Sequence, residues 1–154
     1  MSTISTTITA IKNLSVTDGV KVLRILDITS VPDDLAQRDL PVLMPRPDAF
    51  LTMSQERQAW ALDAAAPRQV TWTTHWLLLV ATVGQGRGVF EPLGDVLTWC
   101  AALAAAAFSD DTLSTSVDAV FEIEQTGLVT SPTGTQYHGA VVSWAITELA
   151  GGAS

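Results

Sequence analysis

The pattern of hydrophobic and polar positions predicts a sheet whose central strand covers residues 69–83. Alternate side chains along this stretch are polar at its start and apolar on both faces at its end, as expected for a strand that enters a core. Two further alternating stretches, residues 117–124 and 136–149, predict strands on either side of a turn at Pro132-Thr133-Gly134. Residues 20–29 and 49–53 predict two shorter strands. Strands that follow one another through turns favour an antiparallel sheet.

Apolar residues at helical spacing predict two helices. The first covers residues 2–14 and places Ile4, Ile8 and Ile11 on one stripe. The second follows Gly88 and presents a stripe that should cover the sheet. That stripe consists of Val89, Leu93, Val96, Leu97, Cys100, Leu103, Ala104 and Phe108. The prediction is therefore an α+β fold, a mostly antiparallel sheet of four to five strands packed by two helices, in a single domain of 154 residues.

Prolines in residues 30–48 predict an extended proline-rich arm. Each proline lacks a backbone N–H and restricts the residue before it, so neither a helix nor a central strand is expected to run through. These prolines are Pro32, Pro41, Pro45 and Pro47. Within the arm, Val42, Leu43 and Met44 are consecutive apolar residues that would be costly on a free surface. They are expected to pack either against their own domain or against a neighbouring molecule.

Two other segments are predicted to lie outside the packed domain. Residues 54–68 are polar and alanine-rich and predict a flexible loop, and residues 150–154 predict a disordered tail. The loop carries an isolated tryptophan, Trp60, which either folds back onto the domain or anchors an interface.

Composition favours a protein that assembles. Apolar residues make up 47% of the chain and charged residues 16%, against roughly 25% charged residues in ordinary soluble domains. A free monomer would have few charges to cover its outside, so we expect surface to be buried between subunits. The net charge of −8 argues against a surface that grips nucleic acid phosphates.

Cysteine usage and the N-terminal sequence argue against a disulfide-rich, a thiolate-metal or a secreted protein. Cys100 is the only cysteine and lies in an apolar pattern, which predicts a core residue and leaves no disulfide framework or thiolate metal cluster. No basic leader with an apolar core opens the sequence. Glu91 and Asp95 interrupt the longest apolar run, which predicts that it does not span a membrane. We expect a soluble, intracellular protein.

The glycine loop Gly84-Gln85-Gly86-Arg87-Gly88 has two interpretations. Glycines before a helix can cradle a phosphate, but a dinucleotide site requires GxGxxG, and Val89 stands at the third glycine position. We favour the second interpretation, a sharp corner between strand and helix. Arg87 at the tip of that corner is then a candidate donor to carboxylates of a neighbouring copy.

No catalytic or metal-binding constellation emerges from the sequence. His75 and His138 are the only histidines, both fall within predicted strands, and no HxxxH or CxxC spacing accompanies them. There is also no GxSxG motif for a serine nucleophile. We therefore expect no enzyme activity, no metal and no cofactor.

The order of elements resembles that of the tail-terminator proteins of long-tailed bacteriophages. The resemblance rests on an N-terminal helix with Ala10-Ile11-Lys12, the segment Leu40-Pro41-Val42-Leu43-Met44-Pro45, the strand entering the glycine loop, and the closing strand after Pro132. It implies a structural virion protein that forms a homohexameric ring. Such a ring caps the tail tube and joins it to the neck or head.

The same resemblance implies partners and a location. The partners would be further copies of the chain, the tail tube protein and the neck or head-closure protein, and DNA would pass through the ring without specific binding. The location would be the tail–neck junction of the virion, after assembly in the host cytoplasm. The alternatives are a neck or head-closure connector of the same kind of particle, a soluble assembly chaperone, and a small nucleotide-binding enzyme that uses Gly84 to Gly88.

A closed ring requires a heterologous interface, in which one patch binds a different patch on the next copy. We predict that this interface uses Leu43, Met44 and Pro45, with Trp60 and Arg87 as further contacts.

Overall fold

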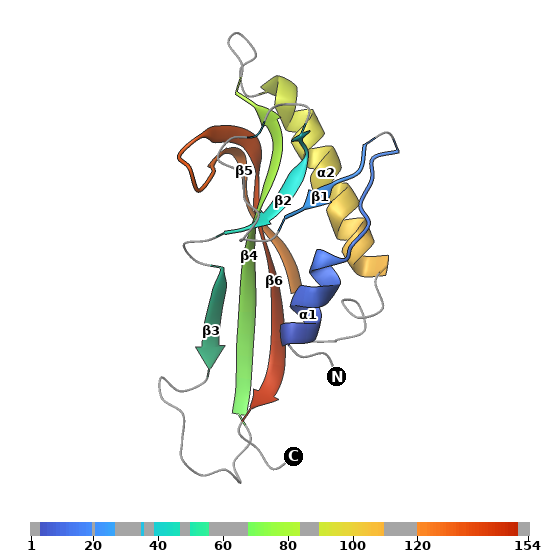
Figure 1. Ribbon diagram of the computed structural model, residues 1–154. Helices are drawn as coiled ribbons and strands as arrows, with labels where there is room; N and C mark the ends of the chain where they lie inside the picture. The colour runs from blue at the N-terminus through green and yellow to red at the C-terminus, as the bar shows by residue number, and fades with distance from the viewer. Residues whose placement is uncertain are drawn as a thin grey trace.

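The computed structural model has an α+β fold in which two helices lie on one side of a mixed, mostly antiparallel sheet (Figure 1). It describes residues 4–19, 21–26, 35, 39–46, 50–55, 68–83, 90–109 and 120–150. The elements are α1 (Ile4–Lys12), β1 (Arg24–Ile25), β2 (Val42–Pro45), β3 (Leu51–Gln55), β4 (Arg68–Thr82), α2 (Phe90–Ser109), β5 (Val120–Thr130) and β6 (Gln136–Ala150). The strand order is β1-β2-β4-β6-β5, and β3 pairs with the first part of β4. Among the described strands, β1 and β2 are the one parallel pair.

The two longest strands, β4 and β6, form the spine of the sheet. Each has 15 residues, and they pair antiparallel along almost their whole length. Gly139 of β6 lies so close to the backbone of Leu78 that a Cβ atom at this position would collide with the Leu78 carbonyl oxygen. Glycine is therefore needed here for the close approach of the two strands rather than for an unusual φ angle.

The helix-covered face of the sheet carries the larger core. Alternate residues of β4 and β6 point toward α1 and α2, as the period of a strand requires. The fully or almost fully buried members include Ile11 of α1, Leu43 of β2, Trp76 and Leu78 of β4, Val96, Trp99 and Leu103 of α2, and Val142 and Trp144 of β6. The tryptophan rings of Trp76 and Trp144 meet edge to face, with centroids 6.2 Å apart.

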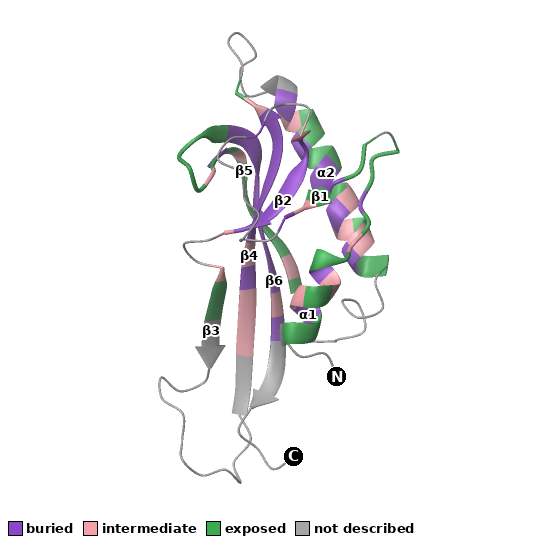
Figure 2. Ribbon diagram, viewed as in Figure 1, coloured by how far each residue is buried: buried purple, intermediate pink, exposed green. Residues whose placement is uncertain are grey.

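The opposite face carries a second core, which no helix covers in the part of the chain that the structure describes. Its buried residues are Leu26, Leu35, Leu40, Val42, Met44, Leu77, Leu79, Val129, Tyr137 and Val141. The Tyr137 hydroxyl accepts a hydrogen bond of 3.0 Å from the Leu35 backbone N–H, which ties the segment before β2 to β6. Figure 2 shows the buried residues of both cores gathered where β2, β4 and β6 run side by side.

The main sequence-based expectations for the fold are confirmed. Both helices are present, the predicted strand over residues 69–83 is β4, and the strand after Pro132 is β6. The turn between β5 and β6 contains Gly134 with φ 91°. The described residues form six strands instead of four to five, because Val42–Pro45, which was not predicted to be a strand, adds β2 between β1 and β4. Of the predicted strand over residues 20–29, only Arg24–Ile25 is a strand within the described residues.

The expected proline-rich arm is wrong for the part of residues 30–48 that the structure describes. Val42–Pro45 is strand β2, which pairs with β1 on one side and β4 on the other, and its residues are buried. Pro41 and Pro45 stand just before and at the end of this short strand, where a missing N–H costs little. Of the two packing options for Leu43 and Met44, the structure shows the one inside their own domain.

The predicted apolar stripe of α2 is partly wrong. Val96, Cys100 and Leu103 face the sheet as expected, but Leu97 is 52% exposed and Phe108 is 72% exposed. Trp99 and Ala107 take the inner positions. From Trp99 to Phe108 every α2 residue is apolar, so helical periodicity alone could not fix which side of the helix faces the sheet.

The predicted loop, the predicted tail and the strand predicted over residues 117–124 agree only in part with the structure. Residues 54 and 55 of the predicted loop belong to β3 and residue 68 to β4, while the rest of that loop, with Trp60, lies outside the described residues. Ala150, the first residue of the predicted tail, ends β6, and residues 151–154 lie outside the described residues. The strand predicted over residues 117–124 is β5, which extends to Thr130. On the face predicted to be buried, Phe121 packs against the helix-covered core but Ile123 is 41% exposed, so that face is only partly covered.

Candidate functional site

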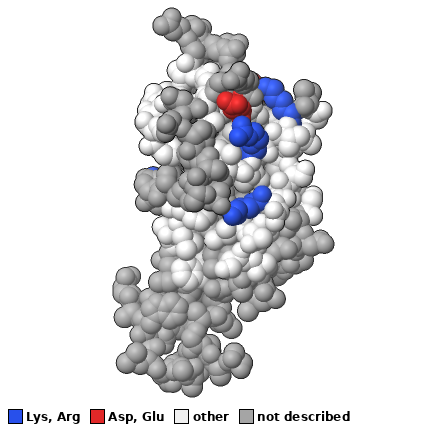
Figure 3. Space-filling view, in the orientation of Figure 1, with Lys and Arg blue, Asp and Glu red and all other residues white. Residues whose placement is uncertain are grey.

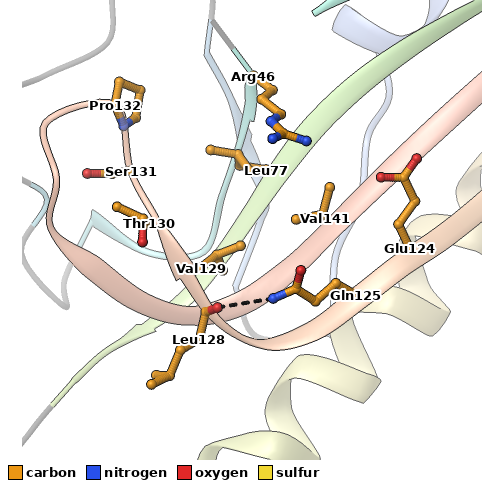
Figure 4. A pocket seen from close by; sticks show the side chains of 10 residues that line it. All are labelled: Arg46, Leu77, Glu124, Gln125, Leu128, Val129, Thr130, Ser131, Pro132 and Val141. Carbon is orange, nitrogen blue, oxygen red and sulfur yellow. Dashed lines mark hydrogen bonds between the residues drawn. The ribbon is translucent and has the colours of Figure 1, made fainter. Parts of the chain in front are cut away.

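A groove opens on the sheet face opposite the helices, between the β5–β6 hairpin and the residue that follows β2. Its volume is about 830 Å³. The lining residues are Arg46, Leu77, Glu124, Gln125, Leu128, Val129, Thr130, Ser131, Pro132 and Val141. We call this cavity the hairpin groove, and Figure 4 shows its lining side chains.

The hairpin groove has an apolar floor and a polar rim. Leu77, Val129 and Val141 belong to the second core and form the floor. The rim combines a guanidinium group on Arg46 and a carboxylate on Glu124 with the amide of Gln125 and the hydroxyls of Thr130 and Ser131 (Figure 4). The Gln125 side-chain amide donates a hydrogen bond of 3.4 Å to the Leu128 carbonyl oxygen. The groove thus offers both hydrogen-bond donors and acceptors around an aliphatic surface.

A β-bulge directs Glu124 toward this face. The pairing of β5 with β6 shifts register between Ile123 and Gln125, so Glu124 is the extra residue of β5. A bulge re-aims the side chain at the extra position. Here the Glu124 Oε1 atom lies 3.4 Å from Nδ1 of His75 on β4.

His75 links three strands. It lies where the neighbour of β4 changes from β2 to β3, and its backbone N–H and carbonyl bond to Phe50 and Arg46. Its Nε2 atom is 3.0 Å from the Thr52 hydroxyl oxygen on β3. The Nδ1 atom is buried and makes no well-oriented hydrogen bond, although the Glu124 carboxylate is near.

The order hydroxyl, imidazole, carboxylate invites comparison with a hydrolase triad, but the geometry favours a structural link. In a triad the carboxylate accepts a hydrogen bond from Nδ1, which orients the ring. Here that bond is not formed. No group of three or more His, Cys, Asp or Glu side chains suited to a metal ion occurs among the residues that the structure describes. Thr52 and His75 therefore link β3 to β4, and the Glu124 carboxylate of β5 lies close to the His75 ring beside the hairpin groove.

The outer face of α2 is the second notable surface. We use this name for Leu97, Ala101, Ala105 and Phe108, which are exposed and follow one another at helical spacing. Asp95 in the first turns is the only charged residue among the α2 side chains described. The face of the molecule in Figure 3 likewise shows few charged side chains among its described atoms. An amphipathic surface helix would place polar residues at these positions.

The same helix meets the length and apolarity of a membrane span. The stretch Pro92–Ser109 has a mean hydropathy of 1.3, and 33% of it is buried in the molecule. The sequence-based expectation had excluded a span here because of Glu91 and Asp95. The inner side of α2 packs on the sheet, so the feature to be explained is its apolar outer side.

Three of the five predicted interface residues are buried in the core, and the other two lie outside the described residues. Leu43 and Met44 are 0% and 1% exposed, and Pro45 is buried with them, so within a single chain their side chains fill the core. Trp60 and Arg87 lie outside the described residues, as does the glycine loop. The subunit contact assigned to these five residues stays a prediction.

Cys100 and His138 are core residues. Cys100 is 2% exposed, and burial raises the pKa of its thiol. A protonated, buried thiol is a poor nucleophile. His138 is 3% exposed on β6. The prediction that Cys100 is a core residue is confirmed.

Sequence reasoning missed the hairpin groove and the link at His75. Thr52, His75 and Glu124 are far apart in the sequence, and no spacing connects them. The alternation over residues 117–124 assumed an unbroken strand, so it could not reveal a bulge at Glu124. No model of a known protein family matches this sequence, and no curated protein matches it either.

Proposed function

We propose that this protein is a ring-forming structural subunit, and specifically a tail terminator that caps the tail tube of a long-tailed bacteriophage. The observation that carries the proposal is the apolar outer face of α2. Leu97 and Phe108 belong to an exposed apolar stripe on α2 that lies beside the polar Asp95 and Thr98, and exposed apolar surface of this kind marks protein–protein contacts. A second copy of the chain that packs against this face would bury it.

Three features support assembly over catalysis. Charged residues make up only 16% of the chain, and eight large apolar side chains are more than a third exposed in the described part of a single copy. Three of the eight, Val120, Ile123 and Leu128, lie on β5 at the edge of the sheet. Surfaces of this kind mark protein–protein contacts. The resemblance in the order of elements supports a tail terminator within the class of ring-forming proteins.

A negative charge suits the proposed position. A ring with about eight net negative charges per subunit repels the phosphate backbone at long range. DNA would therefore pass without being held. DNA must also pass through a neck or head-closure connector without being held, so the net charge does not distinguish a connector from a tail terminator.

Negative-stain electron microscopy of the purified protein tests the proposal. A tail terminator predicts closed rings with six-fold symmetry that bind to the ends of isolated tail tubes. Twelve-fold rings that leave tube ends free would instead identify a connector. Dispersed single molecules at micromolar concentration, with no binding to tubes, would contradict both.

A further inference from the structure

We propose that strand β5 of one copy pairs with strand β3 of a second copy, so that the sheet continues from one subunit into the next. This contact rests on the ring-forming function proposed above and names the strands that join neighbouring subunits. In the part of the chain that the structure describes, β3 and β5 each pair with a single neighbour. Their outer edges therefore present backbone N–H and carbonyl groups that can template a further strand.

The outer side of β1 does not offer such an edge. The Leu23 backbone N–H donates a hydrogen bond of 2.8 Å to the Val16 carbonyl oxygen, and Thr17 forms an antiparallel bridge with Val22. The chain between α1 and β1 thus covers this side of β1. The described sheet keeps two open edges, and Figure 1 shows β3 beside the lower half of β4, on the side away from β6.

The two open edges match in position and direction. The pairing registers align residues of four strands in rows across the sheet. One row is Thr52, Thr73, Ala145 and Val120, and the next is Leu51, Thr74, Trp144 and Phe121. β3 therefore lies level with the start of β5 and runs antiparallel to it, because three antiparallel pairings connect them. A rotation about an axis parallel to these strands brings β5 beside β3 of the next copy as an antiparallel pair, and repeated rotation closes a ring.

The side chains along the two edges fit this pairing. Leu51 is in register with Thr74, and Ile123 with Val142, so both lie on the helix-covered face of the sheet. Leu51 is 44% exposed and Ile123 is 41% exposed in a single copy. In the proposed contact they become neighbours across the joined strands, where aliphatic side chains stabilise a sheet.

The charges and the bulge favour β3 over a second β5 as the partner. β5 carries Glu122 and Glu124 and no basic residue, so two copies of β5 would bring only acidic side chains together, which destabilises a sheet. β3 carries no charged residue. The bulge between Ile123 and Gln125 limits the regular outer edge of β5 to residues 120–123, a length that the five residues of β3 can match.

Cysteine cross-linking tests the contact. The double variant Leu51→Cys/Ile123→Cys places one exposed cysteine on each edge, and β4 and β6 keep the two edges of one copy about 14 Å apart. Disulfides then form only between copies. The matched control is Leu51→Cys/Leu128→Cys, because Leu128 is also exposed on β5 but lies beyond the bulge. The native Cys100 is buried, and the wild-type protein gives its background.

The expected result after mild oxidation is a ladder of covalent oligomers on a non-reducing gel. It should form at least about tenfold faster than with the control, because cysteines more than about 7 Å apart cannot be bridged without movement of the backbone. Leu51→Cys alone and Ile123→Cys alone should give no covalent dimer.

Amide hydrogen exchange of the wild-type protein gives a second readout that needs no variant. A strand paired on one side protects alternate amides, whereas a strand paired on both sides protects consecutive amides. We expect slow exchange at consecutive residues over 120–123 in the assembled protein.

The outcomes separate this contact from the proposed ring, because light scattering on the same samples reports the state of assembly. A closed oligomer in which only alternate β5 amides are protected would overturn the contact and leave the ring in place. So would a folded, assembled double variant that cross-links no faster than the control. A covalent dimer from Ile123→Cys alone would show that β5 pairs with itself instead. A monomer at every concentration would overturn both the contact and the ring.

Discussion

The two faces of the sheet are closed by different means, and the difference locates the surfaces left for partners. On one face, α1 and α2 cover large aromatic and aliphatic side chains of β4 and β6 completely. On the other, no helix is present in the described structure, and the core is closed by β2, Leu35 and the curved β5–β6 hairpin. The helix-covered face leaves the apolar outer side of α2 exposed. The opposite face leaves the hairpin groove.

The largest expected effect comes from substitutions in β2 that disrupt the hydrophobic cores on both faces of the sheet. Leu43 belongs to the helix-covered core and Met44 to the opposite core, and both are fully buried. Replacing both with aspartate buries two charges, each at a cost of several kcal/mol, against a total stability of about 5–15 kcal/mol. We expect an unfolded protein by circular dichroism. A soluble, folded monomer would instead support the earlier prediction that these residues form a subunit contact.

The next effect tests the close contact between β4 and β6 that both faces share. A methyl group on Gly139 would collide with the Leu78 backbone, so Gly139→Ala should lower the free energy of unfolding by about 3 kcal/mol or more. The matched control is Gly94→Ala on the exposed side of α2, where an added methyl meets open space and should stabilise by about 0.5–1 kcal/mol. Denaturant unfolding measures both. Equal stabilities would contradict the register of the two strands.

A smaller effect should distinguish the face that no described helix covers. Tyr137→Phe keeps the ring in the second core but removes the hydroxyl that accepts from the Leu35 N–H. A buried donor without its partner costs about 1–3 kcal/mol. We expect a loss of this size in denaturant unfolding, together with faster amide hydrogen exchange at Leu35. Unchanged exchange at Leu35 would show that this segment is not fastened through Tyr137.

The smallest perturbation probes the helix-covered face through Cys100. Burial raises the pKa of this thiol, so at pH 8 the folded protein should hold it protonated and shielded, whereas the unfolded chain exposes it near its ordinary pKa. We expect slow labelling by a disulfide reagent in the native state and rapid labelling in denaturant. Rapid native labelling would mean that α2 does not cover its core tightly.

The comparison of the two faces also shows what the sequence could predict. The strict alternation in β4 and β6 assigns Trp76 and Leu78 to one face and Leu77 to the other, and the structure agrees, because a strand has only two sides. The orientation of α2 was not predictable, because alanine and leucine occupy inner and outer positions alike. β2 was missed because prolines at strand ends resemble prolines that prevent a strand.

The groove could not be predicted from local patterns at all. It depends on the bulge at Glu124 and on the curvature of the β5–β6 hairpin, and both arise from long-range pairing. Arg46 lies within residues 30–48, which the sequence predicted to be an arm. Its position on the groove rim follows only once β2 is placed in the sheet.

The central claim is that the outer face of α2 is covered by another copy of the chain. Size-exclusion chromatography with light scattering, applied to the wild-type protein and to a Leu97→Asp/Phe108→Asp variant, tests it most directly. Both side chains are exposed in one copy, so the variant should keep its circular dichroism spectrum. The account predicts a closed oligomer for the wild type and a folded monomer for the variant. A wild-type monomer at every concentration, or a variant that still assembles, would contradict it.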